Sequence, residues 1–299
     1  MAFGGVRPVL HLPFGPGPGQ PIVHDELAGL AEAMIAAGVE GLVVLGLASE
    51  AWAVTDTERD RVVATASAAI GGRVPLVVGI DGATAVAVDR GRRAVAAGAA
   101  GLMVLPPPRA TTTSQLVAHY AALADAAGIP ILVQDSPQVT GVTLTLEAIV
   151  ALAGHPLVRS LKVEIPGAGA KTSAAHAAGI EIVAGWGGLQ YIESVARGAA
   201  GCMPGCDLGP AILTLDRMLR GGDPDGADAL YRRIVPLLSY VTQSLDLLLL
   251  GAKHLLRRRR VFSGEALRAP ARALDPHEAA TLDQLFDQLA ADRVPGFGA

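Results

Sequence analysis

A lysine interrupts a short apolar run, and it is the side chain with the clearest chemical potential. The stretch VRSLKVEIPG (158–167) sets Lys162 among β-forming residues and ends in Pro-Gly, so it predicts a buried strand. Lysine is rarely buried without a partner. Burial favours the neutral amine, which can attack a carbonyl carbon and form an imine. Lys162 is therefore a candidate nucleophile, and a purely structural ion pair with Glu164 is the alternative.

The alternation of a strand separates the side chains of this run into two faces. Ser160, Lys162 and Glu164 share one face, while the apolar residues between them share the other. The apolar face is suited to packing against helices. We therefore expect the polar face to point into the interior of a barrel, toward the end where barrel enzymes carry their active sites.

The elements that must position Lys162 follow a repeated order. Eight apolar runs alternate with Ala-rich amphipathic stretches, which predicts parallel strands joined by helices. The fold class expected is α/β, a closed (β/α)8 TIM barrel, and an open doubly wound sheet is the alternative. No G-x-G-x-x-G follows the first run, which disfavours that alternative. The predicted strands are 8–12, 41–46, 75–80, 101–105, 131–135, 159–164, 181–185 and 200–205; the predicted helices are 24–38, 56–70, 83–98, 112–127, 145–154, 168–178, 188–197 and 209–220.

The last part of the chain changes character after GGDPDG (221–226). Helical patterns follow at 225–240, 242–258 and 276–292. We expect a barrel domain over residues 1–220 and a C-terminal helical extension over 221–299. The extension would pack on the barrel or form an oligomer contact.

Composition limits the classes of partner. The 299 residues carry a formal net charge of −4, are 51% hydrophobic and contain two cysteines. A weakly acidic chain gives no electrostatic reason to expect binding to nucleic acid or an anionic membrane. The arginine run in HLLRRRRVF (254–262) is interpreted as a solvated helix end. No apolar run approaches the ~18 residues of a membrane span. A cytoplasmic, reducing location is expected.

Several segments, taken together, make the chain similar to the pyruvate-dependent class I aldolase superfamily, that of dihydrodipicolinate synthase and N-acetylneuraminate lyase. The resemblance implies a (β/α)8 barrel with C-terminal helices, a homo-oligomer (dimer or tetramer), and Lys162 as the Schiff-base lysine. The segments that carry it are LPFGPGPGQPIVHDEL (12–27), GLVVLGLASEAWAVTDTERDRVV (41–63), ILVQDSPQVTG (131–141), SLKVE (160–164) and GAKHLLRRRRVFSGEALRAP (251–270).

The chain also departs from the pattern of that superfamily. Leu47 and Ala48 stand where the synthase has threonines, and Gln134 and Pro108 stand where it has tyrosines. None of these side chains can carry a proton as a hydroxyl relay does. Ser49-Glu50, VQDSP (133–137) and LKVEIPGAGAK (161–171) resemble the L-2-keto-3-deoxyarabonate dehydratase branch instead.

Guided by the resemblance, we expect roles for nine residues. Lys162 would form the imine, Glu164 would take the C3 proton or balance the charge of the lysine, and Gln134 would orient the substrate or a water. Ser49 and the backbone amides of 47–49 would hold the substrate carboxylate, with Glu50 organising that loop. The substrate-binding residues expected are Leu47, Ala48, Ser49, Gly185 and Met203. His11 is interpreted as a core residue.

The expected activity is a Schiff-base lyase acting on a 2-keto-3-deoxy sugar acid, a small-molecule 2-oxo acid, with dehydration as the reaction. The first alternative is a pyruvate-dependent aldolase that condenses or cleaves pyruvate and an aldehyde. The second is a non-catalytic barrel. No cofactor and no metal are expected, because the imine supplies the electron sink that a metal would otherwise provide.

Overall fold

The strands of the protein form a single parallel sheet that closes into a cylinder. A computed structural model describes residues 2–17 and 19–297. Its strands are β1 (Gly5–Val6), β2 (Leu42–Val44), β3 (Leu76–Ile80), β4 (Gly101–Val104), β5 (Ile131–Asp135), β6 (Ser160–Val163), β7 (Glu181–Ala184) and β8 (Gly201–Cys202). They pair in the order β1-β8-β7-β6-β5-β4-β3-β2. Parallel bridges from Val9 to Val43 and to Gly205 close the ring. The predicted (β/α)8 barrel is confirmed.

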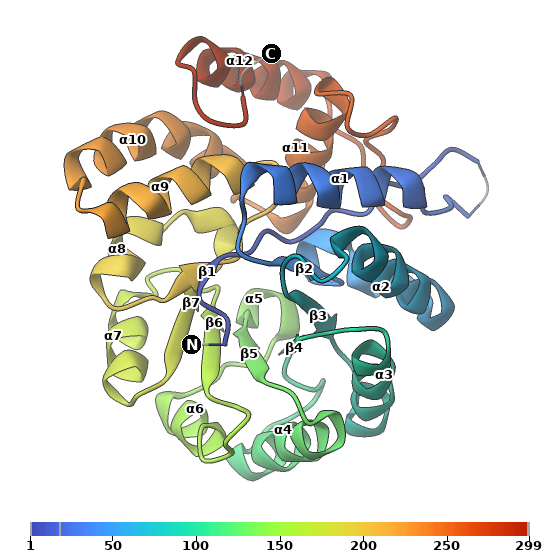
Figure 1. Ribbon diagram of the computed structural model, residues 1–299, viewed down its shortest axis with the longest axis vertical. Coiled ribbons are helices and arrows are strands. Elements are labelled where there is room, and N and C mark those ends of the chain that lie inside the picture. The colour runs from blue at the N-terminus through green and yellow to red at the C-terminus, as the bar shows by residue number, and fades with distance from the viewer. Residues whose placement is uncertain (1, 18, 298–299) are drawn as a thin grey trace.

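Helices surround the cylinder, as Figure 1 shows. Their predicted boundaries agree with the structure to within a few residues. The helices are α1 (His24–Ala37), α2 (Asp56–Ile70), α3 (Thr84–Ala96), α4 (Thr113–Ala127), α5 (Pro137–Thr140), α6 (Leu146–Leu152), α7 (Gly169–Ala177), α8 (Tyr191–Ala196), α9 (Gly209–Gly221), α10 (Pro224–Val241), α11 (Leu245–Arg258) and α12 (Pro276–Ala291).

The first strand is the clearest error of the sequence-based prediction. The expected strand at 8–12 is reduced to the bridges of Val9, and β1 lies at Gly5–Val6 instead. Pro8 begins the expected run and Pro13 follows it, and neither residue has an N–H to donate to a ladder. The segment still runs along the barrel, because Leu10 N donates to Val43 O at 2.8 Å.

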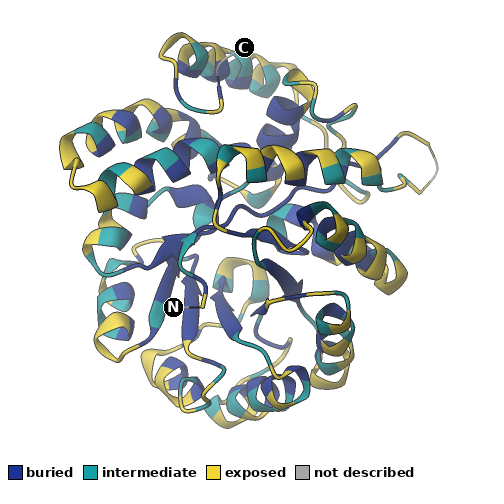
Figure 2. Ribbon diagram, viewed as in Figure 1, coloured by how far each residue is buried: buried dark blue, intermediate teal, exposed yellow. Residues whose placement is uncertain are grey.

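The two faces of the strands bury different residues. A compact cluster fills the cylinder, and a much larger one, which includes Leu161 and Val163 of β6, packs between the sheet and the helices. Figure 2 shows buried strands and helices whose outer faces are exposed. The inner cluster consists of Phe3, Val9, Val43, Val77, Met103, Leu132, Val183 and Met203.

The C-terminal helices gather on one side of the barrel, beside α1 and α9 (Figure 1). Asp223 begins α10 by accepting a hydrogen bond from Gly226 N at 2.9 Å. The middle of α11 is buried from Leu249 to Leu256. None of the helices in the described parts of the chain is long and apolar enough to cross a membrane.

Candidate active site

Lys162 and Glu164 lie side by side inside the barrel. The Nζ atom of Lys162 is 2.9 Å from Oε1 of Glu164, and the two side chains are 3% and 7% exposed. Lys162 pairs in register with Val183, whose side chain belongs to the inner cluster. The predicted inward face of β6 is therefore confirmed. A buried amine next to a buried carboxylate has a proton acceptor within reach.

Gln134 joins this pair from the neighbouring strand. It is the register partner of Lys162 on β5, and its Nε2 donates to Oε2 of Glu164 at 2.5 Å. The backbone N–H of Trp186 donates to Oε1 of the same carboxylate at 3.4 Å. Three groups from β5, β6 and the turn after β7 thus surround Glu164. The structure brings together the three residues predicted to be catalytic.

Gly185 makes room for Glu164. A Cβ atom at position 185 would lie 2.3 Å from Cγ of Glu164, which no real contact allows. Gly185 was expected to bind the substrate, and the geometry shows that its lack of a side chain makes room for the Glu164 carboxylate. Met203 belongs to the inner cluster with Val183 and Val9, so it forms part of the apolar floor of the barrel.

The loop predicted to hold a substrate carboxylate is a 3-10 turn, Leu47–Ser49, directly after β2. Ser49 is buried, its hydroxyl donates to Leu10 O at 2.6 Å, and its N–H donates to Gly46 O at 3.0 Å. Both polar groups are therefore engaged within the protein. Leu47 and Ala48 are partly exposed. That their backbone amides bind the substrate carboxylate therefore stays a prediction.

Glu50 connects this loop to the C-terminal helices. Its backbone adopts a left-handed conformation with φ of 52°, and its Oε1 lies 2.5 Å from Nζ of Lys253 on α11. Its other oxygen accepts the backbone N–H of Arg268 at 2.9 Å. Burial lowers the pKa of Lys253, and the charge of Glu50 opposes that shift. The role of Glu50 was expected; its partner Lys253 was missed, because nothing local in the sequence links them.

His11 lies near the same end of the barrel and is neutral. Burial, reinforced by the positive charge of Lys253, lowers its pKa to about 3. A Cβ atom at Gly205 would lie 2.3 Å from Oδ1 of Asp207 and 2.9 Å from the His11 ring. His11 and Asp207 thus flank the same glycine. His11 is buried, as expected of a core residue, but its Nδ1 has no hydrogen-bond partner among the described residues.

A cavity of about 270 Å³ lies beside this site. Gln134 belongs to its wall, so the cavity shares a residue with the contacts of Glu164. The sequence analysis did not find it, because its walls combine residues of three strands with residues of the loops after several strands. The cavity is lined by Leu45, Gly46, Leu47, Ala51, Trp52, Gly79, Ile80, Asp81, Met103, Leu105, Gln134 and Val139.

The chain is similar to known enzymes over nearly its full length. The model of the dihydrodipicolinate synthetase family matches residues 2–289. L-2-keto-3-deoxyarabonate dehydratase of Azospirillum brasilense is 34% identical over 259 residues, 83% of each chain. 4-Hydroxy-tetrahydrodipicolinate synthase 1 of Streptomyces coelicolor is 32% identical over 279 residues, which are 90% of this chain and 88% of the synthase. The crystal structure of dihydrodipicolinate synthase from Rhodopseudomonas palustris superposes with a TM-score of 0.89 at 25% identity, covering 96% of this chain and 98% of that one.

Proposed function

The chain belongs to the dihydrodipicolinate synthetase family, and from that premise we propose that it is a class I lyase whose Lys162 forms a Schiff base with a 2-oxo acid. The observation that carries the proposal is the buried cluster of Lys162, Glu164 and Gln134 on the inner face of two neighbouring strands. Its members combine a nucleophile, a proton acceptor and an orienting amide.

The reaction proposed is dehydration of a 2-oxo acid that carries a hydroxyl on C4, as a 2-keto-3-deoxy sugar acid does. The amine of Lys162 attacks C2, and water leaves as the imine forms. The protonated imine draws electrons from C3, and Glu164 takes the C3 proton. The C4–O bond then breaks, and the hydroxyl leaves as water with the proton that Glu164 took. Where C5 carries a hydroxyl, as in L-2-keto-3-deoxyarabonate, loss of a C5 proton and protonation of C3 convert the alkene into the enol of a C5 aldehyde. Hydrolysis of the imine then releases the product and restores the amine. The dehydratase from Azospirillum brasilense supports this reaction.

The position of the acidic group favours dehydration over aldol cleavage. Aldol cleavage begins with loss of the C4 hydroxyl proton, whereas dehydration begins at C3, next to the imine carbon. Glu164 contacts Nζ of Lys162, so its carboxylate lies beside the atoms that surround C2. Gln134 cannot ionise at physiological pH and cannot serve as the base.

Aldol chemistry is the second candidate, and the synthase from Streptomyces coelicolor supports it. The same imine would then join pyruvate to an aldehyde or release it from one. Family membership also supports a homo-oligomer, a dimer or tetramer, as part of the proposal.

Borohydride reduction tests the proposal. The protein is treated with pyruvate or with L-2-keto-3-deoxyarabonate, reduced, and weighed intact by mass spectrometry. We expect an adduct with each compound and, without reductant, a semialdehyde product from the sugar acid. Release of pyruvate from it would favour the aldolase. Absence of an adduct with both compounds would contradict the proposal and favour a non-catalytic barrel.

A further inference from the structure

The cavity that Gln134 lines has a mainly apolar wall. Its side chains are mainly aliphatic or aromatic and come from β3, β4 and β5 and from the segments that follow β2, β3, β4 and β5. Trp52 and Val139, which are 51% and 38% exposed, are its most exposed apolar residues. They lie on a 3-10 turn (Ala51–Ala53) and on α5, respectively. An exposed tryptophan beside an apolar cavity suits contact with a ligand better than contact with water.

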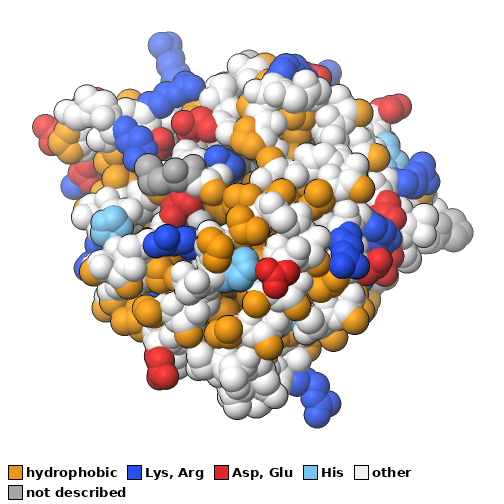
Figure 3. Space-filling view, turned by 60° about the horizontal axis from the view of Figure 1, so that its bottom comes forward, with side chains coloured by type: hydrophobic (Ala, Val, Ile, Leu, Met, Phe, Trp, Pro, Cys, Tyr) orange, Lys and Arg blue, Asp and Glu red, His pale blue; other side chains and the backbone are white. Residues whose placement is uncertain are grey.

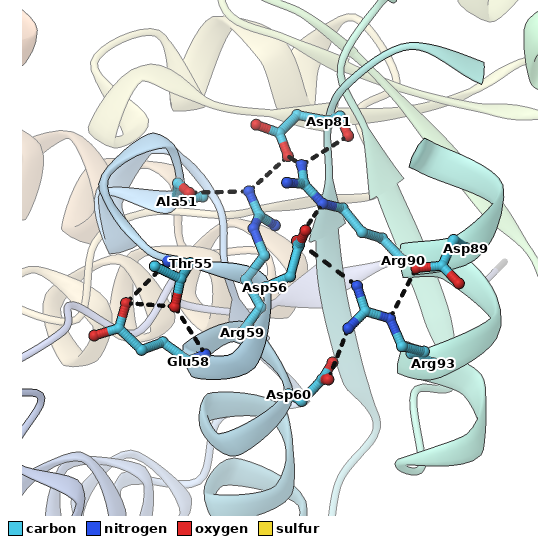
Figure 4. A network of polar contacts seen from close by, with 10 residues as sticks. All are labelled: Ala51, Thr55, Asp56, Glu58, Arg59, Asp60, Asp81, Asp89, Arg90 and Arg93. Carbon is cyan, nitrogen blue, oxygen red and sulfur yellow. Dashed lines mark hydrogen bonds and ion pairs between the residues drawn. The ribbon is translucent and has the colours of Figure 1, made fainter. Parts of the chain in front are cut away.

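The two polar side chains of the wall are already partnered. Oδ1 of Asp81 accepts from Arg59 at 2.6 Å and from Arg90 at 2.7 Å, as Figure 4 shows. Arg59 is itself buried and also donates to Ala51 O at 2.9 Å. Gln134 donates to Glu164. These contacts engage both side chains in part, so a ligand group that carried several hydroxyls into this cavity would lose more hydrogen bonds to water than Asp81 and Gln134 could replace.

Gln134 links the cavity to the reacting centre. Its amide contacts the carboxylate that pairs with Lys162, and the same side chain lines the cavity. A 2-oxo acid bound through C2 to Lys162 can therefore extend its C4 substituent past Gln134 into the cavity. The volume of about 270 Å³ accommodates a ring with a short substituent, since a cavity of about 150 Å³ already holds benzene.

We propose that this cavity receives the C4 substituent of the substrate and that the substituent is apolar, either a single aromatic ring or a branched alkyl group. The inference rests on the proposed function, because it places C2 of the substrate on Lys162. It narrows the substrate class from 4-hydroxy-2-oxo acids in general to those whose C4 carbon bears such a group. Dehydration would convert them to the 2-oxo-3-alkenoic acid and water.

A competition between matched substrates tests this inference. The compounds share C1 to C4 and carry phenyl, isopropyl or hydroxymethyl on C4, the last being L-2-keto-3-deoxyarabonate. Consumption of each substrate is measured by chromatography, so that the assay detects both dehydration and aldol cleavage. We expect kcat/KM to be at least about tenfold higher with the phenyl or isopropyl group. Equal or higher kcat/KM with hydroxymethyl would overturn the inference.

Two valine variants locate the effect. Val139→Thr adds a hydroxyl at nearly constant volume inside the cavity, and Val150→Thr makes the same change on the exposed surface of α6. We expect V139T to lower the ratio of kcat/KM for the phenyl compound to kcat/KM for the hydroxymethyl compound several-fold, while V150T leaves this ratio unchanged. Equal behaviour of the two variants would contradict the inference. If V139T changed the oligomeric mass but not kcat/KM, the cavity would belong to a contact between copies of the chain. That result would also contradict the inference.

Pyruvate trapping separates this inference from the function on which it rests. Pyruvate has no C4, so its borohydride adduct tests the imine without using the cavity. An adduct with pyruvate together with a preference for hydroxymethyl would overturn only the apolar substituent. Absence of any adduct would overturn the proposed function itself.

Discussion

At the scale of single residues, Glu164 is the group on which the proposed chemistry depends. Its carboxylate is held by Lys162, Gln134 and the N–H of Trp186, all within the barrel. When the amine becomes an imine, Glu164 keeps two of these contacts and can accept a proton from C3. The carboxylate is thus positioned before the substrate arrives, which is how a general base contributes most to a rate.

We predict that Glu164→Gln lowers kcat for dehydration by about 10²- to 10⁴-fold, the usual contribution of a general base. Pyruvate should still be trapped on the protein, because Lys162 keeps its amine. Steady-state kinetics and intact mass measure the two effects. Glu147→Gln, on the exposed face of α6, is the matched control and should change neither. An E164Q variant with normal kcat would exclude Glu164 as the base.

The sequence predicted the inward face of Lys162 and Glu164 because the period of a strand is two residues. It did not predict the bond between Gln134 and Glu164, which depends on the register of β5 against β6. The sequence likewise did not predict the hydrogen bond of the Ser49 hydroxyl, because its acceptor, Leu10 O, lies on another segment. The local sequence pattern of a strand predicts which side chains share a face, whereas contacts between segments can be seen only in the assembled barrel.

At the scale of elements, α11 is joined to the loop after β2. Lys253 lies 2.5 Å from Glu50, donates to Ala266 O at 2.9 Å and lies 4.2 Å from the centre of the Phe14 ring. Lys253 and Glu50 are each 1% exposed. The C-terminal helices were expected as an appendage or an oligomer contact. The structure shows that α11 supports the turn that carries Leu47 and Ala48.

We predict that Lys253→Met lowers the free energy of unfolding by about 3–5 kcal/mol, because it leaves the Glu50 carboxylate buried without its cation. The double variant Glu50→Gln/Lys253→Met should recover most of that loss. Denaturant titration of the two single variants and the double variant measures the coupling. A loss below about 1 kcal/mol in K253M would show that the pair does not hold the loop.

At the scale of the whole molecule, the repeated strand and helix order made the barrel predictable, and the errors lie where the repeat is irregular. The strand expected at 8–12 was wrong, because a proline begins that run and another follows it. The short α5 and the 3-10 turns after β2 and β7 were not predicted, and these turns contribute several walls of the site. Arg257 and Arg258 of the basic run pair with Glu265 and Asp283. On the face in Figure 3, basic and acidic side chains are interspersed around apolar ones.

Stability of the whole fold should fall on mild acidification, and His11 contributes to that fall. Its pKa is about 3 in the folded state and 6.5 ordinarily, so the unfolded chain binds its proton first as the pH drops. The stabilisation is complete above pH 6.5 and is lost progressively toward pH 3. By pH 5 this loss lowers the free energy of unfolding by about 2 kcal/mol. Asp207, whose pKa burial raises to about 6, acts in the opposite direction.

We predict that His11→Gln flattens this dependence. The free energy of unfolding of wild type should fall between pH 7 and pH 5 by about 2 kcal/mol more than that of H11Q. Comparing the two slopes isolates His11, because Asp207 and the other titrating groups are present in both proteins. Identical slopes would show that His11 gains a proton in the folded state as easily as in the unfolded one.

The most direct test of the central claim is to find which amine carries the substrate. The chain has only three lysines, Lys162, Lys171 and Lys253, and each is ion-paired in the structure. After reduction with pyruvate and borohydride, peptide mass spectrometry should place the adduct on Lys162 alone, and Lys162→Ala should lose it while Lys171→Arg keeps it. An adduct on Lys171 or Lys253, or an unchanged adduct in a folded K162A variant, would contradict the account.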